Sequence, residues 1–362
     1  KNDYAEAYYN LANILRDEGN SRAAIKYFKE AIKINPNYSQ AYNNLGSVLL
    51  DKGHLNGSID VFRNLLNIGP EMPETHYNIG IAQLHKGEVE NAVISFKRAI
   101  EINPNYANAY WNLYGTSTTI NEAQYWIECC LKTDKNYEVA LLTSAALKAY
   151  KGDKKDLEEL KSSKFKDHHY MRSFNWVFSL PETPKLLFNK WSLFKYAIKQ
   201  SIKDRPFYEY GVFRGDSFRF LIETYKIGYG FDTFTGLPED WHDREKGSYS
   251  SEGDIPKIDG GHFVVGKFEN SLPKLFSQKR PLASIINFDA DLYSSTICAL
   301  DFSKQIIDEN TILIFDEFLI NKKWEEDEFK ALTEFCSNNG LGYKVIAVSF
   351  FSKQVAVKLV FI

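Results

Sequence analysis

Apolar and small side chains recur along the first third of the chain in a pattern that restarts every 34 residues. Apolar positions three or four residues apart predict two amphipathic helices in each copy. Gly19-Asn20, Gly53-His54 and Gly87-Glu88 predict the turn between these helices. The matching positions are Tyr8, Leu11, Ala12, Ala24, Phe28 and Ala31, then Tyr42, Leu45, Gly46, Ser58, Phe62 and Leu65, then His76, Ile79, Gly80, Ala92, Phe96 and Ala99. We therefore expect a stack of helical hairpins.

A unit of 34 residues that holds two helices resembles the tetratricopeptide repeat. Ala12, Gly46 and Gly80 are small enough for the two helices of a hairpin to approach, and a Phe in each second helix fills the space between repeats. The pattern weakens after residue 106, as expected for the end of a stack. We predict a tetratricopeptide repeat domain over residues 1–162, with three clear and one or two degenerate repeats, followed by a second domain over residues 163–362.

The first helix of each repeat carries asparagines that face the concave groove of such an array. They are Asn10, Asn13, Asn44, Asn78 and Asn112. Asparagines here can hydrogen-bond an extended peptide, but they also occur in arrays that only act as scaffolds. The groove is therefore predicted to bind a protein or peptide, to present a glycan, or to join two copies of the chain.

From about Phe165 short apolar runs alternate with helical segments, which predicts a parallel sheet. The predicted strands are 207–211, 229–232, 262–266, 283–288 and 311–315, followed by an antiparallel pair at 343–350 and 354–361. Ser217 to Lys226 is the predicted helix after the first strand. Residues 174–203 are predicted to form aromatic-rich helices that pack between the domains. The expected fold is an α-helical solenoid followed by a Rossmann-like, seven-stranded α/β domain.

The turn after the first strand of that sheet runs from Glu209 to Ser217. Gly211 and Gly215 let the backbone approach a ligand, and the helix start at Ser217 offers free amide donors. The spacing matches neither a dinucleotide fingerprint nor a phosphate loop. Asp232 ends the next strand, where an acid accepts the hydroxyls of a ribose. This combination predicts a nucleoside ligand without a pyrophosphate, and S-adenosylmethionine fits.

Two later strands end in pairs of acids, Asp289 with Asp291 and Asp316 with Glu317. Neighbouring parallel strands would bring these carboxylates to one edge of the sheet, where they repel one another unless a divalent cation or a proton relieves them. Singly, each aspartate could instead cap a following helix. The group of four predicts a metal site with one acid left for chemistry.

The second half of the chain resembles the macrocin O-methyltransferase group of metal-dependent and S-adenosylmethionine-dependent sugar methyltransferases. The matching segments are Glu209–Gly215, Gly230–Pro238, Val265–Pro273, Phe288–Thr296 and Phe315–Phe318. The resemblance implies that Mg²⁺ or another divalent cation binds Asp289, Asp316 and Glu317, where the family more usually has two aspartates at the last pair. It also implies that Asp291 is the general base that deprotonates a sugar hydroxyl.

The predicted activity is therefore an O-methyltransferase that uses S-adenosylmethionine on a sugar-containing acceptor. The predicted cofactor-binding residues are Glu209, Gly211, Phe213, Gly215, Ser217, Asp232 and Phe268. The polar segment 238–262 is long enough to be a lid, with Trp241 or Tyr249 stacking on a ring and His242 contacting the acceptor, or it is a disordered surface loop.

Two other functions stay open at this point. One is a metal-dependent glycosyltransferase that holds a nucleotide-sugar through Asp289-Ala290-Asp291, and the other is a repeat scaffold with an inactive enzyme domain. The net charge of -3 favours neither nucleic acid nor an anionic membrane as a partner. No apolar stretch is long enough to span a membrane, and we expect a cytoplasmic protein. The four cysteines lack metal-ligand spacing.

Overall fold

The computed structural model describes residues 2–361, and internal contacts divide the chain into two compact units. The first unit ends at Thr116 and also includes Glu128–Asn136. The second comprises Ser117–Ile127 and the chain from Tyr137 onward. The predicted boundary between residues 162 and 163 follows the repeat pattern rather than the contacts, and it stays a prediction.

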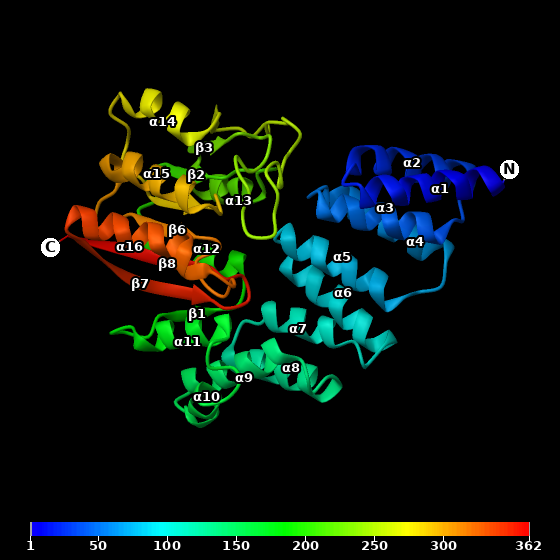
Figure 1. The fold of residues 1–362 in the computed structure, drawn as a ribbon, viewed down its shortest axis with the longest axis horizontal. Helices are drawn as coiled ribbons and strands as arrows, with labels where there is room; N and C mark the ends of the chain where they lie inside the picture. The colour runs from blue at the N-terminus through cyan, green and yellow to red at the C-terminus, as the bar shows by residue number, and fades with distance from the viewer. Residues whose placement is uncertain (1, 362) are drawn as a thin grey trace. The chain divides into compact units, whose positions relative to one another are not determined.

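The first unit consists of helical hairpins joined by short turns (Figure 1). Its helices are α1 (Asn2–Asp17), α2 (Ser21–Ile34), α3 (Ser39–Asp51), α4 (Leu55–Ile68), α5 (Pro73–His85), α6 (Val89–Ile102) and α7 (Ala107–Gly115). The turns inside the hairpins use Gly19, Gly53 and Gly87, each with a positive φ. Such φ values favour glycine because other side chains clash with their own backbone there. The predicted hairpins and turns are confirmed.

Glycine and phenylalanine pack against each other inside these hairpins as the repeat pattern predicts. Phe28, Phe62 and Phe96 are fully buried. A Cβ atom added to Gly46 would lie 2.7 Å from the Phe62 ring, and one added to Gly80 would lie 2.6 Å from the Phe96 ring. Both distances are shorter than van der Waals contact, so a Cβ atom at Gly46 or Gly80 would force the phenylalanine ring or the helix to shift.

We expect Gly46→Ala to destabilise the α3–α4 hairpin by about 1–3 kcal/mol, because the new methyl group overlaps the buried Phe62 ring. Gly57→Ala in α4 is the matched control, since its nearest neighbour would be Leu49 at 3.7 Å, an ordinary contact. That change should stabilise the hairpin by up to about 1 kcal/mol through helix propensity. Hydrogen exchange of peptides from α3 and α4 measures both effects, and equal protection in the two variants would contradict the packing argument.

Three further helices follow where the degenerate repeats are predicted. They are α8 (Ile120–Thr133), α9 (Glu138–Tyr150) and α10 (Lys155–Lys161). In the second unit α9 packs near α11 (His169–Ser179) and the end of a long strand, because the Tyr150 ring lies 5.1 Å from Phe178 and 5.9 Å from Phe350. By these contacts α9 is part of the same compact unit as the sheet.

The second unit is built around one mixed sheet of eight strands. The strands are β1 (Lys185–Leu187), β2 (Phe207–Tyr210), β3 (Gly228–Asp232), β4 (Gly261–Val265), β5 (Ile285–Phe288), β6 (Ile312–Phe315), β7 (Leu341–Ser349) and β8 (Val355–Phe361). Their order is β1-β7-β8-β6-β5-β2-β3-β4, and only β8 runs antiparallel to its neighbours. The predicted seven strands are all present, but the predicted number is wrong because β1, three residues long, was too short to recognise.

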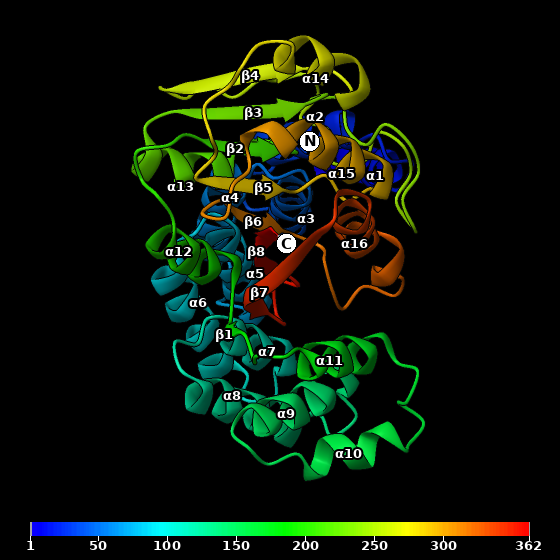
Figure 2. The same ribbon diagram turned by 90° about the vertical axis from the view of Figure 1, so that its left-hand side faces the viewer.

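Helices cover both faces of the sheet (Figure 2). One face carries α12 (Lys190–Gln200) and α13 (Asp216–Tyr225), and the other carries α14 (Phe268–Phe276), α15 (Tyr293–Ser303) and α16 (Glu328–Asn339). The Trp191 ring in α12 lies 5.1 Å from Phe220 in α13, so the aromatic residues of this region form core between the helices. The sheet is therefore buried on both faces, as its continuous apolar strands require.

A row of stacked rings crosses four strands where they end. Phe231, Tyr210, Phe288 and Phe315 are the rings of this row, on β3, β2, β5 and β6, and successive ring centroids lie 4.6, 5.4 and 4.8 Å apart. Successive side chains of a strand point to opposite faces. The next residues, Asp232, Gly211, Asp289 and Asp316, are therefore aligned in a second row at the same edge. The pairing of the strands thus brings four predicted site residues together.

Candidate active site

The edge formed by these residues includes the point where the strand order reverses. β2 has β3 on one side and β5 on the other, and open α/β sheets bind ligands at such a point. Gly211 follows β2 with a φ of 89°, and a Cβ atom added there would lie 1.8 Å from the carbonyl oxygen of Asp289. Only glycine lets the turn after β2 pass this close to the end of β5.

Asp232 holds the glycine-containing turn in place. Its Oδ2 accepts hydrogen bonds from the backbone amides of Val212 and Phe213, each at 2.8 Å, and its Oδ1 accepts one from the amide of Phe234 at 2.7 Å. A carboxylate offers about four acceptor positions, so one remains beyond these three. The predicted ribose contact of Asp232 stays a prediction, and the structure adds a structural role for the same carboxylate.

Glu209 is a fully buried acid at the end of β2. Asn287 Nδ2 donates to its Oε1 at 2.8 Å, whereas its Oε2 has no hydrogen-bond partner among the described residues. Burial raises the pKa of Glu209 to about 8. An unpaired buried oxygen fits a ligand that brings a hydrogen-bond donor or a positive charge.

The raised pKa of Glu209 predicts a pH-dependent loss of stability in the chain without ligand. The neutral carboxyl group favours the folded state, so its contribution is fully present below about pH 4.5 and is lost as the pH rises through about 8. Glu209→Gln stays neutral at every pH. Relative to this variant, the Tm of the unsubstituted chain should fall by roughly 5 °C or more between pH 5 and pH 9. Parallel Tm profiles for the two proteins would show that Glu209 does not titrate in this range.

The four predicted acids are brought into one electrostatic group, and the structure adds a fifth. The pKa of Asp291 is raised well above its usual range by burial and by Asp289, Glu317 and Asp316. Burial and the three aspartates of the group likewise raise the pKa of Glu328, the first residue of α16. Asp291 also has a φ of 60°, a left-handed conformation that aspartate adopts at some cost. A group of acids with raised pKa values and a strained backbone position thus lie at the same edge of the sheet.

Two lysines that the sequence analysis missed lie among these acids. Lys190 Nζ is 2.8 Å from Asp289 Oδ2 and 3.3 Å from Asp316 Oδ1. Lys353 lies in the turn between β7 and β8, and its Nζ is 3.0 Å from Glu317 Oε2. A capping box between Asn189 and Ser192 starts α12 and fixes the backbone of Lys190. This motif marks the start of the helix in the sequence, but it does not indicate that the Lys190 side chain reaches the acids.

The donor chemistry of this edge fits a hard divalent cation, because carboxylate oxygens are the ligands that Mg²⁺ prefers. Within residues 2–361, no three His, Cys, Asp or Glu side chains lie close enough together to bind a metal ion. Lys190 Nζ takes the space between Asp289 and Asp316, and Gln354 donates to Asp316 as well. The metal ligands Asp289, Asp316 and Glu317 stay a prediction.

Of the other predicted cofactor residues, Phe213, Gly215 and Ser217 belong to the same turn, and Phe268 begins α14. Gly215 caps α13 with a φ of 79°, and Ser217 is buried in its first turn. The ring of Phe213 faces the Arg214 guanidinium at 5.4 Å. Phe268, at the start of α14, packs edge-on against Tyr210 with the ring centroids 5.4 Å apart. The structure places these side chains around the edge, and their contacts with a cofactor stay predictions.

Segment 238–262 is tied to the helices beside the site. Asp327, buried just before α16, accepts hydrogen bonds from Trp241 Nε1 at 3.2 Å and pairs with His242 Nε2 at 2.7 Å. Tyr249 is 48% exposed, and its pKa is raised by the part of the side chain that is buried and by the charge of Asp291. His242 thus has Asp327 as its partner in this structure, and its predicted contact with an acceptor stays a prediction.

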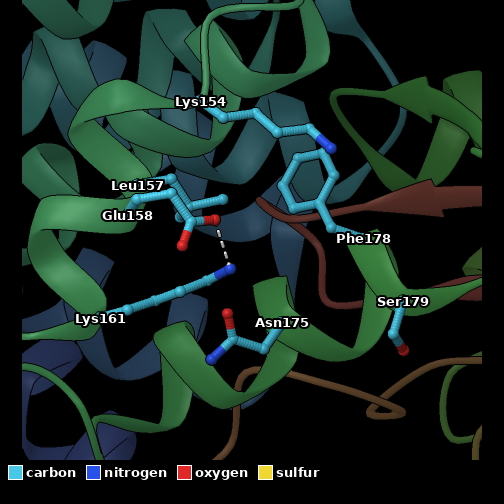
Figure 3. Close-up of a pocket in the computed structure, with 7 residues that line it drawn as sticks. All are labelled: Lys154, Leu157, Glu158, Lys161, Asn175, Phe178 and Ser179. Atoms are coloured by element: carbon cyan, nitrogen blue, oxygen red, sulfur yellow. Dashed lines mark hydrogen bonds and ion pairs between the residues drawn. The ribbon is translucent and has the colours of Figure 1, made fainter.

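A separate hollow of about 400 Å³ lies between α10 and α11 (Figure 3). Its lining comprises Lys154, Leu157, Glu158, Lys161, Asn175, Phe178 and Ser179. Lys161 and Glu158 form an ion pair of 2.7 Å inside it, so their charges compensate each other. The hollow lacks the glycine turn and the acid pairs of the sheet edge, and we assign it no function.

Comparison with protein-family models identifies the repeats. One tetratricopeptide repeat model matches residues 5–38 and 73–106, and another matches residues 27–60. The chain carries tetratricopeptide repeats.

No curated protein matches the sequence. In the described residues, no helix is long and apolar enough to cross a membrane.

Solved structures resemble parts of the chain. YrrB, described as a tetratricopeptide repeat protein with an unusual peptide-binding site, is 21% identical with a TM-score of 0.39 and covers 46% of this chain and 88% of its own. MamA from Desulfovibrio magneticus is 20% identical with a TM-score of 0.40 and covers 44% and 93%. The calicheamicin methyltransferase CalS11 is 17% identical with a TM-score of 0.38 and covers 56% and 90%. Likenesses this weak decide nothing about activity.

Proposed function

We propose that the α/β part of the chain, predicted over residues 163–362, is a class I methyltransferase that transfers a methyl group from S-adenosylmethionine to a sugar hydroxyl. The observation that carries this proposal is that the Gly211 turn, Asp232 and the group of acids lie together at the point where the strand order reverses. The turn and Asp232 suit a nucleoside, and the acids suit an acceptor that must lose a proton. One edge therefore offers both halves of a methyl transfer.

The cofactor supplies a methyl group that is already activated on a sulfonium. In our proposal Gly211 and Gly215 leave room for it, Ser217 and the start of α13 offer amide and hydroxyl donors, and Asp232 uses its remaining lone pair on the ribose. The unpaired Oε2 of Glu209 accepts from the positively charged amino group. Phe213 and Phe268 provide apolar surface.

Asp291 acts as the general base in this proposal. The methyl carbon forms its new bond to the acceptor oxygen while the sulfur keeps the electron pair of the broken bond, and the hydroxyl proton passes to Asp291. A raised pKa makes its carboxylate a stronger base once it is ionised. A divalent cation held by Asp289, Asp316 and Glu317 would lower the pKa of the acceptor hydroxyl. The tetratricopeptide repeats would hold the acceptor, a partner protein or peptide, or a second copy of the chain.

The direct test is formation of S-adenosylhomocysteine by the full chain with a panel of nucleotide-sugars and glycans. We expect turnover with at least one sugar in the presence of Mg²⁺ and its loss on adding a chelator. Release of a nucleoside diphosphate from a nucleotide-sugar, without S-adenosylhomocysteine, would replace this proposal with a glycosyltransferase. Absence of both products across the panel would favour a repeat scaffold with an inactive enzyme domain.

A further inference from the structure

We propose that Lys190 is the internal cation of the Asp289–Asp316 pair, and that a divalent cation can bind this pair only by displacing the Lys190 ammonium. This inference concerns the same edge and rests on the proposed metal site. It assigns Lys190 a role in controlling metal affinity, which makes it a positioning residue rather than a catalytic one.

The position of the ammonium carries the argument. Lys190 Nζ lies 2.8 Å from an oxygen of Asp289 and 3.3 Å from an oxygen of Asp316, so it bridges the ends of two adjacent parallel strands. A cation shared by the two carboxylates would have to occupy the same space. The Lys190 ammonium and a divalent cation cannot both occupy this space, because two positive charges so close together repel each other strongly in a partly buried site.

The balance of charge explains why some cation must be there. Asp289, Asp291, Asp316, Glu317 and Glu328 are the acids of this edge, and Lys190 and Lys353 are the cations in contact with them. Lys353 forms an ion pair with Glu317 and donates a hydrogen bond to Asn321. Without Lys190, no positively charged side chain of the described residues would contact the two facing aspartates. Removing one partner of such a pair leaves a costly uncompensated charge.

The Lys190 side chain has the freedom that displacement requires. Its backbone is fixed at the start of α12 by the Asn189–Ser192 capping box, but its side chain is 24% exposed, and its Nζ lies 5.7 Å from the centroid of the Phe194 ring. Glu209 lies within electrostatic reach and has an oxygen without a partner. The ammonium can thus leave the two aspartates by rotating about its own side-chain bonds, without moving the helix.

The consequence is that metal affinity is set by competition. In the free chain the Lys190 ammonium compensates charge on Asp289 and Asp316, so Mg²⁺ binds weakly, whereas a variant without this charge should bind it more tightly. The test uses calorimetric titration of the full chain with MgCl₂ alone, without cofactor or acceptor. Lys190→Gln removes the ammonium, Lys190→Arg keeps a positive charge, and Lys195→Gln changes an exposed lysine of the same helix.

We expect Lys190→Gln to bind Mg²⁺ about tenfold or more tightly than the unsubstituted chain. Lys190→Arg and Lys195→Gln should retain the weak affinity. An affinity in Lys190→Gln equal to or weaker than that of the unsubstituted chain would overturn the proposal. A titration with S-adenosylmethionine in the same samples separates the two failures, because cofactor binding without any effect of Lys190 leaves the methyltransferase proposal intact.

A second measurement needs no variant and covers the case in which Lys190→Gln does not fold. Acetic anhydride labels free lysine side chains, and mass spectrometry reports the labelling of each lysine in the unsubstituted chain. Saturating Mg²⁺ should raise the labelling of Lys190 severalfold and leave that of Lys195 unchanged. Unchanged labelling of Lys190 while Mg²⁺ is bound would show that the ammonium is not displaced.

Discussion

Asp291→Asn is expected to lower the rate of methyl transfer by about 10²–10⁴-fold while leaving the affinity for S-adenosylmethionine unchanged. Asparagine has the same shape but cannot accept a proton from the acceptor hydroxyl. It also tolerates the left-handed backbone of this position, where φ is 60°, so the substitution should preserve the local fold. The measurements are kcat with any sugar that supports turnover and the Kd of S-adenosylmethionine.

Asp243→Asn is the control for this substitution, because Asp243 lies in segment 238–262 with its side chain 89% exposed. Its removal should leave both kcat and Kd unchanged. Turnover by Asp291→Asn at the rate of the unsubstituted chain would remove Asp291 from the base role. The neighbouring acids, the half-buried Glu317 and the fully buried Glu328, would then be the groups to replace next.

Gly211→Ala is expected to abolish binding of S-adenosylmethionine and to destabilise the second unit by about 3 kcal/mol or more. The added Cβ would lie 1.8 Å from the carbonyl oxygen of Asp289, so the turn or the end of β5 must move. Either movement separates the glycine turn from the acids. Calorimetric titration and the midpoint of thermal unfolding measure the two effects.

Gly152→Ala separates this overlap from backbone strain alone. Gly152 has a φ of 97° in the turn between α9 and α10, and a Cβ atom there would meet nothing within 4 Å. It should therefore show only the cost of a left-handed alanine, about 1–2 kcal/mol, with cofactor binding retained. Equal losses of stability and of binding in the two variants would contradict the close approach of Gly211 to Asp289.

The repeats could be predicted from the sequence because each repeat packs against its sequence neighbours. The contact between Gly46 and Phe62 recurs between Gly80 and Phe96, and a periodic contact leaves a periodic sequence. The strands could be predicted for a similar reason, since those buried on both faces are continuous apolar runs. The sequence contains no comparable signal for β1, because a strand of three residues is too short to form a pattern.

The acids of the site could also be predicted, because each follows directly after a strand. The turn at Gly211 and the ends of β5 and β6 meet wherever these strands pair in parallel. Lys190 and Glu328 could not, since each begins a helix rather than following a strand directly, and only the packing of these helices brings them to the edge. Asp232 was predicted for the ribose alone, and its three bonds to backbone amides were not foreseen.

Binding of S-adenosylmethionine tests the central claim most directly. The measurement is a calorimetric titration of the full chain with S-adenosylmethionine and, separately, with UDP-sugars, each with and without Mg²⁺. We predict micromolar binding of S-adenosylmethionine that does not require the metal and disappears in Gly211→Ala. Failure of S-adenosylmethionine to bind, together with metal-dependent binding of a UDP-sugar, would contradict the methyltransferase and assign the edge to a glycosyltransferase.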